Sequence, residues 1–190
     1  MFVYKKKLLY SPSGFTLMEL LVSVAIFLII TGLVIVNFRS GRYRDELVGA
    51  AEAIQTSLRE MQTAYNSGDT VECVTGEKEP PANGFGVEIT EIPTIKTFAD
   101  CGKDTPGVDY QYEDTDVLLK EITISSHITV DITAPNELTL NVVFAPNSEE
   151  VRINQDVNFG GDAEILLEHT KSGRQATVTI NSISGLIFYE

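Results

Sequence analysis

One apolar run constrains this chain more than any other feature. Residues 15–38 read FTLMELLVSVAIFLIITGLVIVNF, and Glu19 is their only acidic residue. Apolar side chains cover all faces of a helix with this sequence rather than one stripe, which is typical of a buried or membrane-spanning helix. At 1.5 Å per residue, about 20 such residues cross a hydrocarbon core roughly 30 Å thick. The sequence therefore predicts a transmembrane helix over residues 15–38.

A short basic leader, residues 1–14, precedes this run and contains Lys5 to Lys7. A secretory signal places its small-residue cleavage site after the apolar run, whereas Ser11 to Gly14 comes before it. Cleavage there would remove the leader and keep the apolar helix. By the positive-inside rule the lysines place the N-terminus in the cytoplasm and the rest of the chain outside it, although three arginines between residues 39 and 44 weaken this asymmetry.

Glu19 needs a physical reason, because an ionisable group inside a membrane span is costly and points to a function. In the first turn of a helix the dipole favours an anion. The α-ammonium of a chain that begins at Phe15 could pair with it, and pairing between chains would fix the axial register of neighbouring helices. The alternative is that Glu19 snorkels to the membrane interface.

The segment from Gly14 through Phe15-Thr16-Leu17-Met18-Glu19 to Val22, after a Lys-rich leader, resembles the class III signal of type IV pilins and of type II secretion pseudopilins. The resemblance implies cleavage between Gly14 and Phe15 by a membrane prepilin peptidase, which also N-methylates Phe15. It further implies that Glu19 serves subunit recruitment and filament packing. Many pilins carry a proline farther along this helix, whereas Gly32 and Gly41 are its weak points here.

The helix is predicted to continue through residues 39–66 as an amphipathic segment. Apolar positions recur at steps of three and four, as one face of a helix requires. They are Leu47, Ala51, Ile54, Leu58, Met61 and Tyr65. The sequence Asn66-Ser67-Gly68 predicts the helix end. Packing on a sheet is favoured over a dimeric coiled coil, because the face is shorter than three heptads and contains alanine.

A β-rich body is predicted over residues 67–190. The apolar period changes to two, and Pro, Gly and Asn separate short segments that are typical of antiparallel strands. The predicted strands are 85–89, 118–124, 128–132, 138–144, 165–167, 176–180 and 186–189. Val143 suggests that both faces of its strand are covered. The expected fold class is α+β, a pilin fold with a long N-terminal helix packed on an antiparallel sheet or small β-sandwich.

Several stretches of the body resemble the GspH/FimT type of minor pilins and pseudopilins. They are Ala64–Cys73, Asn83–Val87, Val143–Asn147, Ala176–Ile180 and Ser184–Ile187. Each is only a strand with a turn, so their order along the chain carries the resemblance. The family usually has Gly where this chain has Ser148.

Cys73 and Cys101 are the only cysteines, in a body expected outside the cytoplasm. An even pair there predicts a disulfide, and two buried, unbridged thiols are the alternative.

An acidic stretch, residues 104–116, suggests a calcium site through Asp109, Glu113, Asp114 and Asp116. The EF-hand spacing is absent, so a solvated acidic loop without bound metal is the favoured interpretation. No cofactor is expected.

Catalytic motifs are absent from the sequence. His127 and His169 are interpreted as isolated strand or surface residues, and no zinc-protease, phosphate-loop or nucleophile-elbow pattern occurs. Tyr110 and Tyr112 could form a binding strip, but packing is the commoner role. From Phe15 onward the chain has 11 basic and 27 acidic residues, which disfavours nucleic-acid binding.

The sequence thus predicts a structural subunit rather than an enzyme. It would be an inner-membrane protein with a single span and an extracytoplasmic body, later assembled into a type IV pilus or periplasmic pseudopilus, and the resemblance favours a minor subunit. Expected partners are other pilin or pseudopilin subunits through the helix, the prepilin peptidase and the inner-membrane assembly machinery. The alternatives are a pilus-displayed adhesive or cargo-binding module and a membrane-anchored enzyme.

Overall fold

The computed structural model describes residues 14–73, 76–102, 110–113, 115–135, 137–145, 151–154 and 161–190, without the side chains of residues 36–40. The chain divides into two compact units, Met1–Gly41 and Arg42–Glu190. We call the second one the head unit.

A single long helix, α1 (Leu17–Ser67), runs from the membrane segment into the head unit. Thr16 caps its start, because the hydroxyl oxygen of Thr16 accepts a hydrogen bond from the Glu19 N–H at 3.2 Å. At its end Gly68 has a φ of 68°, and the Asp69 N–H donates to the carbonyl of Ala64 at 3.0 Å. This is a Schellman motif, in which glycine supplies the left-handed conformation that ends a helix. The helix end predicted at residues 66–68 is confirmed.

The predicted apolar face of α1 is buried in the head unit. Ala51, Ile54 and Leu58 are fully buried, Leu47 and Met61 nearly so, and Tyr65 packs against the same core. These side chains lie in one hydrophobic cluster with residues from both large sheets. Packing on sheets, rather than on a second helix, therefore buries this face.

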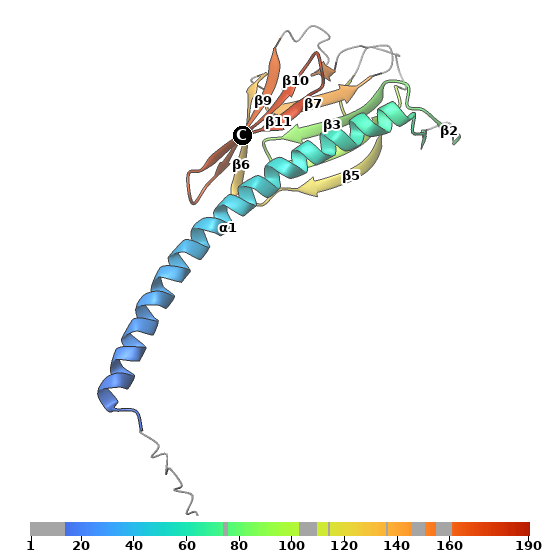
Figure 1. Cartoon of the computed structure of the whole chain (residues 1–190). Coiled ribbons are helices and arrows are strands. Elements are labelled where there is room, and N and C mark those ends of the chain that lie inside the picture. The colour runs from blue at the N-terminus through green and yellow to red at the C-terminus, as the bar shows by residue number, and fades with distance from the viewer. Residues whose placement is uncertain are drawn as a thin grey trace, which may run out of the picture. The chain divides into compact units, whose positions relative to one another are not determined.

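Two large antiparallel sheets form most of the β structure (Figure 1). The five-stranded sheet has the order β5 (Val117–Thr123), β4 (Thr94–Asp100), β3 (Gly84–Thr90), β7 (Thr139–Phe144) and β8 (Arg152–Ile153). The four-stranded sheet has the order β11 (Ile187–Tyr189), β10 (Gln175–Asn181), β9 (Asp162–His169) and β6 (Ile128–Ala134). A small ribbon pairs β1 (Val71–Glu72) with β2 (Lys78–Glu79). The fold is α+β, as the sequence predicts.

The outer face of the five-stranded sheet is also covered. Phe98 and Val143 are fully buried there beneath Tyr110, and the ring of Tyr112 lies 5.4 Å from that of Phe98. Gly86 pairs with Phe98 across β3 and β4, and the Phe98 ring occupies the space where a side chain at residue 86 would lie. The prediction that both faces are covered at Val143 is confirmed, and both tyrosines pack against this layer.

The strand β4 has no counterpart among the predicted strands. Its sequence TIKTFAD alternates weakly, since Lys96 and Thr97 interrupt the apolar residues. Thr97 is nonetheless buried, at 1% exposure, because β4 lies between β3 and β5 and buries polar and apolar residues alike. Position within the sheet, rather than local propensity, makes this segment a strand.

Two sheet edges are protected against pairing with other chains. On β11, the carbonyl of Ile187 accepts a hydrogen bond from the Gln55 side chain of α1 at 3.0 Å. On β5, the register shifts by one residue at Leu119, and the charged residues Lys120 and Glu121 follow. A covering helix, a bulge and edge charges are recognised ways to block edge-to-edge association.

Candidate functional site

The part of α1 that is long and apolar enough to cross a membrane is Leu17–Ile35, 19 residues of which none is buried, and we call it the membrane-spanning part of α1. At 1.5 Å per residue this length matches the hydrocarbon core of a bilayer, about 30 Å. The hydroxyls of Ser23 and Thr31 donate to the carbonyls of Glu19 and Phe27, each at 2.7 Å. These polar groups are therefore satisfied within the helix itself, and they do not oppose burial in lipid or in a helix bundle.

Glu19 differs from these polar residues. Its backbone N–H is capped by Thr16, but within the described residues no group hydrogen-bonds or ion-pairs with its carboxylate. The carboxylate lies in the first turn of α1, next to the positive end of the helix dipole. A partner for this charge would have to come from outside the described residues.

The predicted cleavage site lies just before the helix. Gly14, Phe15 and Thr16 belong to neither a helix nor a strand, and Phe15 is 79% exposed. No other part of the described chain lies within 4 Å of the position that a side chain at Gly14 would take. Within the described residues, Gly14 and Phe15 on the two sides of the predicted cleavage point are therefore exposed.

A second cluster, which the sequence did not predict, joins α1 to the four-stranded sheet. The Nε2 atom of His169 lies 3.3 Å from Oε2 of Glu46, and Nδ1 of His127 lies 3.5 Å from the same oxygen. The two imidazole rings stack with centroids 6.0 Å apart, and Tyr43 contacts the ring of His169 at 4.7 Å. The interpretation of the two histidines as isolated residues is wrong, because the pairing of β6 with β9 places Ile128 opposite His169.

Lys171 fixes the orientation of both rings. Its backbone N–H donates to Nδ1 of His169 at 3.2 Å, so a neutral ring there carries its proton on Nε2, which faces Glu46. Its ammonium lies 2.9 Å from Nε2 of His127 and can only donate, so a neutral His127 carries its proton on Nδ1, which also faces Glu46. The Glu46 carboxylate thus faces an N–H group from each ring.

The electrostatics of Glu46 follow from these contacts. Partial burial raises the pKa of Glu46, but the hydrogen bond from His169 and the charges of His127 and Arg42 act in the opposite direction and outweigh it. The pKa of Glu46 is therefore lowered from its ordinary value. Because Glu46 of α1 contacts both histidines, the cluster is a network of polar contacts between helix and sheet. Among the described residues no three His, Cys, Asp or Glu side chains are spaced to hold a metal ion.

We expect Glu46→Gln to destabilise the head unit in a pH-dependent way. Because folding lowers the pKa of Glu46, its ionised carboxylate stabilises the fold above the ordinary pKa of glutamate, about 4.3. That contribution is lost as the pH falls through the lower, folded value. The difference in the free energy of unfolding between wild type and Glu46→Gln should therefore shrink on acidification, as measured by urea titration at several pH values.

The matched control is Asp131→Asn, which removes an exposed carboxylate on β6 away from the histidines. It should leave the free energy of unfolding nearly unchanged at neutral pH. A difference between wild type and Glu46→Gln that stayed constant from neutral to acidic pH would show that the charge of Glu46 does not stabilise the fold.

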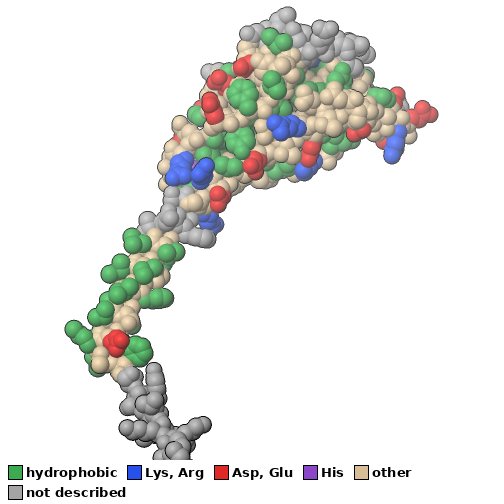
Figure 2. Space-filling view, in the orientation of Figure 1, with side chains coloured by type: hydrophobic (Ala, Val, Ile, Leu, Met, Phe, Trp, Pro, Cys, Tyr) green, Lys and Arg blue, Asp and Glu red, His purple; other side chains and the backbone are tan. Residues whose placement is uncertain are grey.

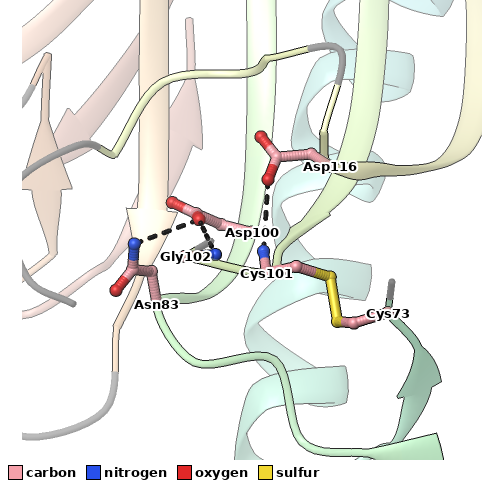
Figure 3. Close-up of a disulfide and its surroundings, with 6 residues drawn as sticks. All are labelled: Cys73, Asn83, Asp100, Cys101, Gly102 and Asp116. Carbon is pink, nitrogen blue, oxygen red and sulfur yellow. Dashed lines mark hydrogen bonds between the residues drawn. A yellow bond between two sulfur atoms is a disulfide. The ribbon is translucent and has the colours of Figure 1, made fainter. Parts of the chain in front are cut away.

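The predicted disulfide is present. Cys73 and Cys101 are bridged, which links the segment after α1 to the residue that follows β4 (Figure 3). Beside it, Oδ1 of Asp100 accepts hydrogen bonds from the Asn83 side chain at 3.1 Å and from the Gly102 N–H at 3.0 Å (Figure 3). The bridge is therefore embedded in an ordered corner of the head unit.

The candidate calcium ligands are only partly within the described residues. Asp109 and Asp114 lie outside them. Asp116 uses Oδ1 to accept from the Cys101 N–H at 3.1 Å and Oδ2 to accept from the Glu113 N–H at 2.9 Å. Both oxygens thus hold backbone groups, and this is a structural use of the carboxylate.

Comparison with known proteins identifies the N-terminal segment. Residues 11–35 match the prokaryotic N-terminal methylation motif. The match covers the predicted cleavage site, Glu19 and the membrane-spanning part of α1, and it ends before the head unit begins. It supports a type IV pilin-like protein that is processed by a prepilin peptidase and anchored in a membrane. No curated protein and no solved structure matches the chain.

Proposed function

We propose that this chain is a minor subunit of a type IV pilus or of a type II secretion pseudopilus. Its precursor is held in the inner membrane by α1, cleaved between Gly14 and Phe15, and N-methylated at Phe15. The mature subunit then joins other subunits through the exposed apolar half of α1. The role is structural and requires no catalytic residue or cofactor.

One observation carries the proposal. The methylation motif coincides with a membrane-length helix that is exposed along its whole apolar span and has, in its first turn, a carboxylate with no partner among the described residues. Cleavage before Phe15 would create an α-ammonium four residues from Glu19. In an assembled bundle, packing between the apolar helices holds the subunits together. Pairing of Glu19 with the amine of a neighbouring subunit sets the axial spacing between the two helices.

The assignment to a minor subunit of the GspH/FimT type rests on the order of turns and strands in the body. Asn83–Val87, Ala176–Ile180 and Ser184–Ile187 fall on β3, on β10 and on the turn into β11. The segment 146–148, where this chain has Ser148, lies outside the described residues. An extracytoplasmic head unit is consistent with the disulfide, since such bonds persist in oxidising compartments.

The test is the N-terminus and mass of the protein in membranes of its own host, with and without the prepilin peptidase. We expect the mature chain to begin with N-methylated Phe15 only when the peptidase is present. In the same membranes Glu19→Gln should remain anchored but fail to enter sheared filaments, because an amide cannot pair with the amine as an ion.

Ser23→Ala is the matched control, because the Ser23 hydroxyl is already bonded within its own helix. It should be processed and assembled like the wild type. Retention of Met1 in both strains would reject the proposal, and the chain would then be an ordinary membrane-anchored domain. Normal assembly of Glu19→Gln would reject the register role alone.

A further inference from the structure

The head unit has an uneven charge distribution. Arg42–Glu190 contains 10 basic and 26 acidic residues, so its net charge is strongly negative, and Figure 2 shows acidic side chains at several places on the face that it draws. Four of the ten basic residues lie on two segments that the fold brings together. They are Arg42 and Arg44 on α1, and Lys171 and Arg174 in the turn between β9 and β10. We call these four residues the basic surface.

Contacts through the histidine cluster join the two segments. Arg42 lies 3.5 Å from Oε1 of Glu46, and Glu46 contacts both histidines. The Lys171 ammonium lies 2.9 Å from His127, and the Arg174 carbonyl accepts a hydrogen bond from the His169 N–H at 2.9 Å. The turn and the side of α1 that carries Arg42 and Glu46 therefore form one local surface, and Arg44 lies beside it on α1, about 200° around the helix from Arg42.

The basic surface keeps a positive charge. Its only acidic neighbours on α1 are Asp45 and Glu46, and Glu46 is engaged by Arg42 and the histidines. With Glu168, which precedes Lys171 by three residues on β9, four basic residues lie near three acidic ones here, whereas the rest of Arg42–Glu190 has 6 basic and 23 acidic residues. Arg42 is 74% exposed, and the other three basic residues are also exposed.

The position of this surface along the chain selects its ligand. Arg42 follows Ile35, the last residue of the membrane-spanning part of α1, by only seven residues. Along the chain the basic surface therefore begins at the first residue of the head unit, close to the end of the span. Basic residues next to a span are attracted by anionic headgroups over about a Debye length, whereas the acidic remainder is repelled.

We propose that the basic surface docks the head unit of the membrane-stored subunit on anionic lipid headgroups before assembly. The inference rests on the proposed membrane-anchored precursor. It assigns to Lys171 and Arg174, which are distant from the span in sequence, a role in orienting the subunit on the membrane. Extraction of the subunit into a filament would then have to break these lipid contacts.

The test uses the full chain reconstituted in vesicles, with a spin label on a single introduced cysteine. Both native cysteines are bridged, so only the new thiol is labelled. Ser126→Cys places the label on an exposed turn beside His127. Thr63→Cys places it on an exposed position of α1, about 25 Å along the helix from Glu46. Collisions with oxygen report proximity to lipid, and collisions with a water-soluble nickel chelate report exposure to water.

We expect the label at residue 126 to gain oxygen accessibility and to lose nickel accessibility when phosphatidylglycerol is added to phosphatidylcholine vesicles. The label at residue 63 should not respond. Lys171→Gln combined with Arg174→Gln should abolish the response, and so should about 1 M salt, which shortens the Debye length to about 3 Å. Lys78→Gln, which removes an exposed lysine on β2, is the matched control and should retain the response.

Lys171 also contacts His127, so Arg44→Gln provides a second variant outside the histidine cluster, and it should reduce the response without changing thermal stability. An equal response at residues 63 and 126, or no response to phosphatidylglycerol, would overturn the docking inference. Alkaline extraction of the same vesicles reports anchoring separately. A chain that is released would refute the anchored precursor itself, whereas a chain that is retained without the lipid response would refute only the docking.

Discussion

Gly84→Ala is expected to abolish stable folding of the head unit. Gly84 has a φ of 104°, which L side chains rarely adopt, and a Cβ atom there would collide with the carbonyl oxygen of Phe144 and lie 3.0 Å from the Cα of Ala145. Both obstacles are backbone atoms next to the pairing of β3 with β7, so they cannot move without loss of register. Backbone strain and lost pairing together should cost more than about 4 kcal/mol.

The matched control is Gly49→Ala on the exposed side of α1. No atom beyond the local helix backbone lies within 4 Å of a Cβ at that position. Alanine has the higher helix propensity, so this variant should be more stable than the wild type by about 0.5 to 1 kcal/mol. Urea titration of the detergent-solubilised full chain measures both changes. A Gly84→Ala protein with the wild-type midpoint would show that β3 and β7 do not pair as described.

Removal of the disulfide is the second large expected effect. Cys73 and Cys101 are 28 residues apart, and closing a loop of this size stabilises a fold by about 3 to 4 kcal/mol in the chain-entropy model. The double variant Cys73→Ser with Cys101→Ser should therefore unfold at clearly lower urea concentration than the oxidised wild type.

Chemical reduction provides the control for this experiment. Reductant should lower the stability of the wild type toward that of the double serine variant and leave the variant unchanged. If the oxidised wild type and the double variant unfolded at the same urea concentration, the bridge would make no net contribution to the stability of the head unit.

The elements that depend on local pattern were predictable from the sequence. The buried face of α1 follows from the spacing of Leu47, Ile54 and Leu58, and its end follows from Gly68. Strands with clear alternation were located within a few residues, because each second side chain enters the core. The membrane span required only length and composition.

Features that depend on pairing between distant segments were not predictable in this way. The strand β4 is fixed by its neighbours β3 and β5 rather than by its own weak alternation. Glu46 and His169 are 123 residues apart and meet only because α1 packs where β6 pairs with β9. A single sequence contains no record of which strands pair, so neither the histidine cluster nor the basic surface could be derived from it.

The covalent link between Cys73 and Cys101 also bears on mechanical load. Cys73 follows the C-terminal end of α1, and Cys101 follows the last residue of β4 in the five-stranded sheet. When the mature helix is pulled toward its N-terminus along its own axis, force enters the head unit as shear across the buried face of α1, because the far end of the helix is tied to the sheet. Shear loads many contacts at once instead of peeling them apart one by one, so a filament of the kind proposed above would transmit tension without detaching its heads.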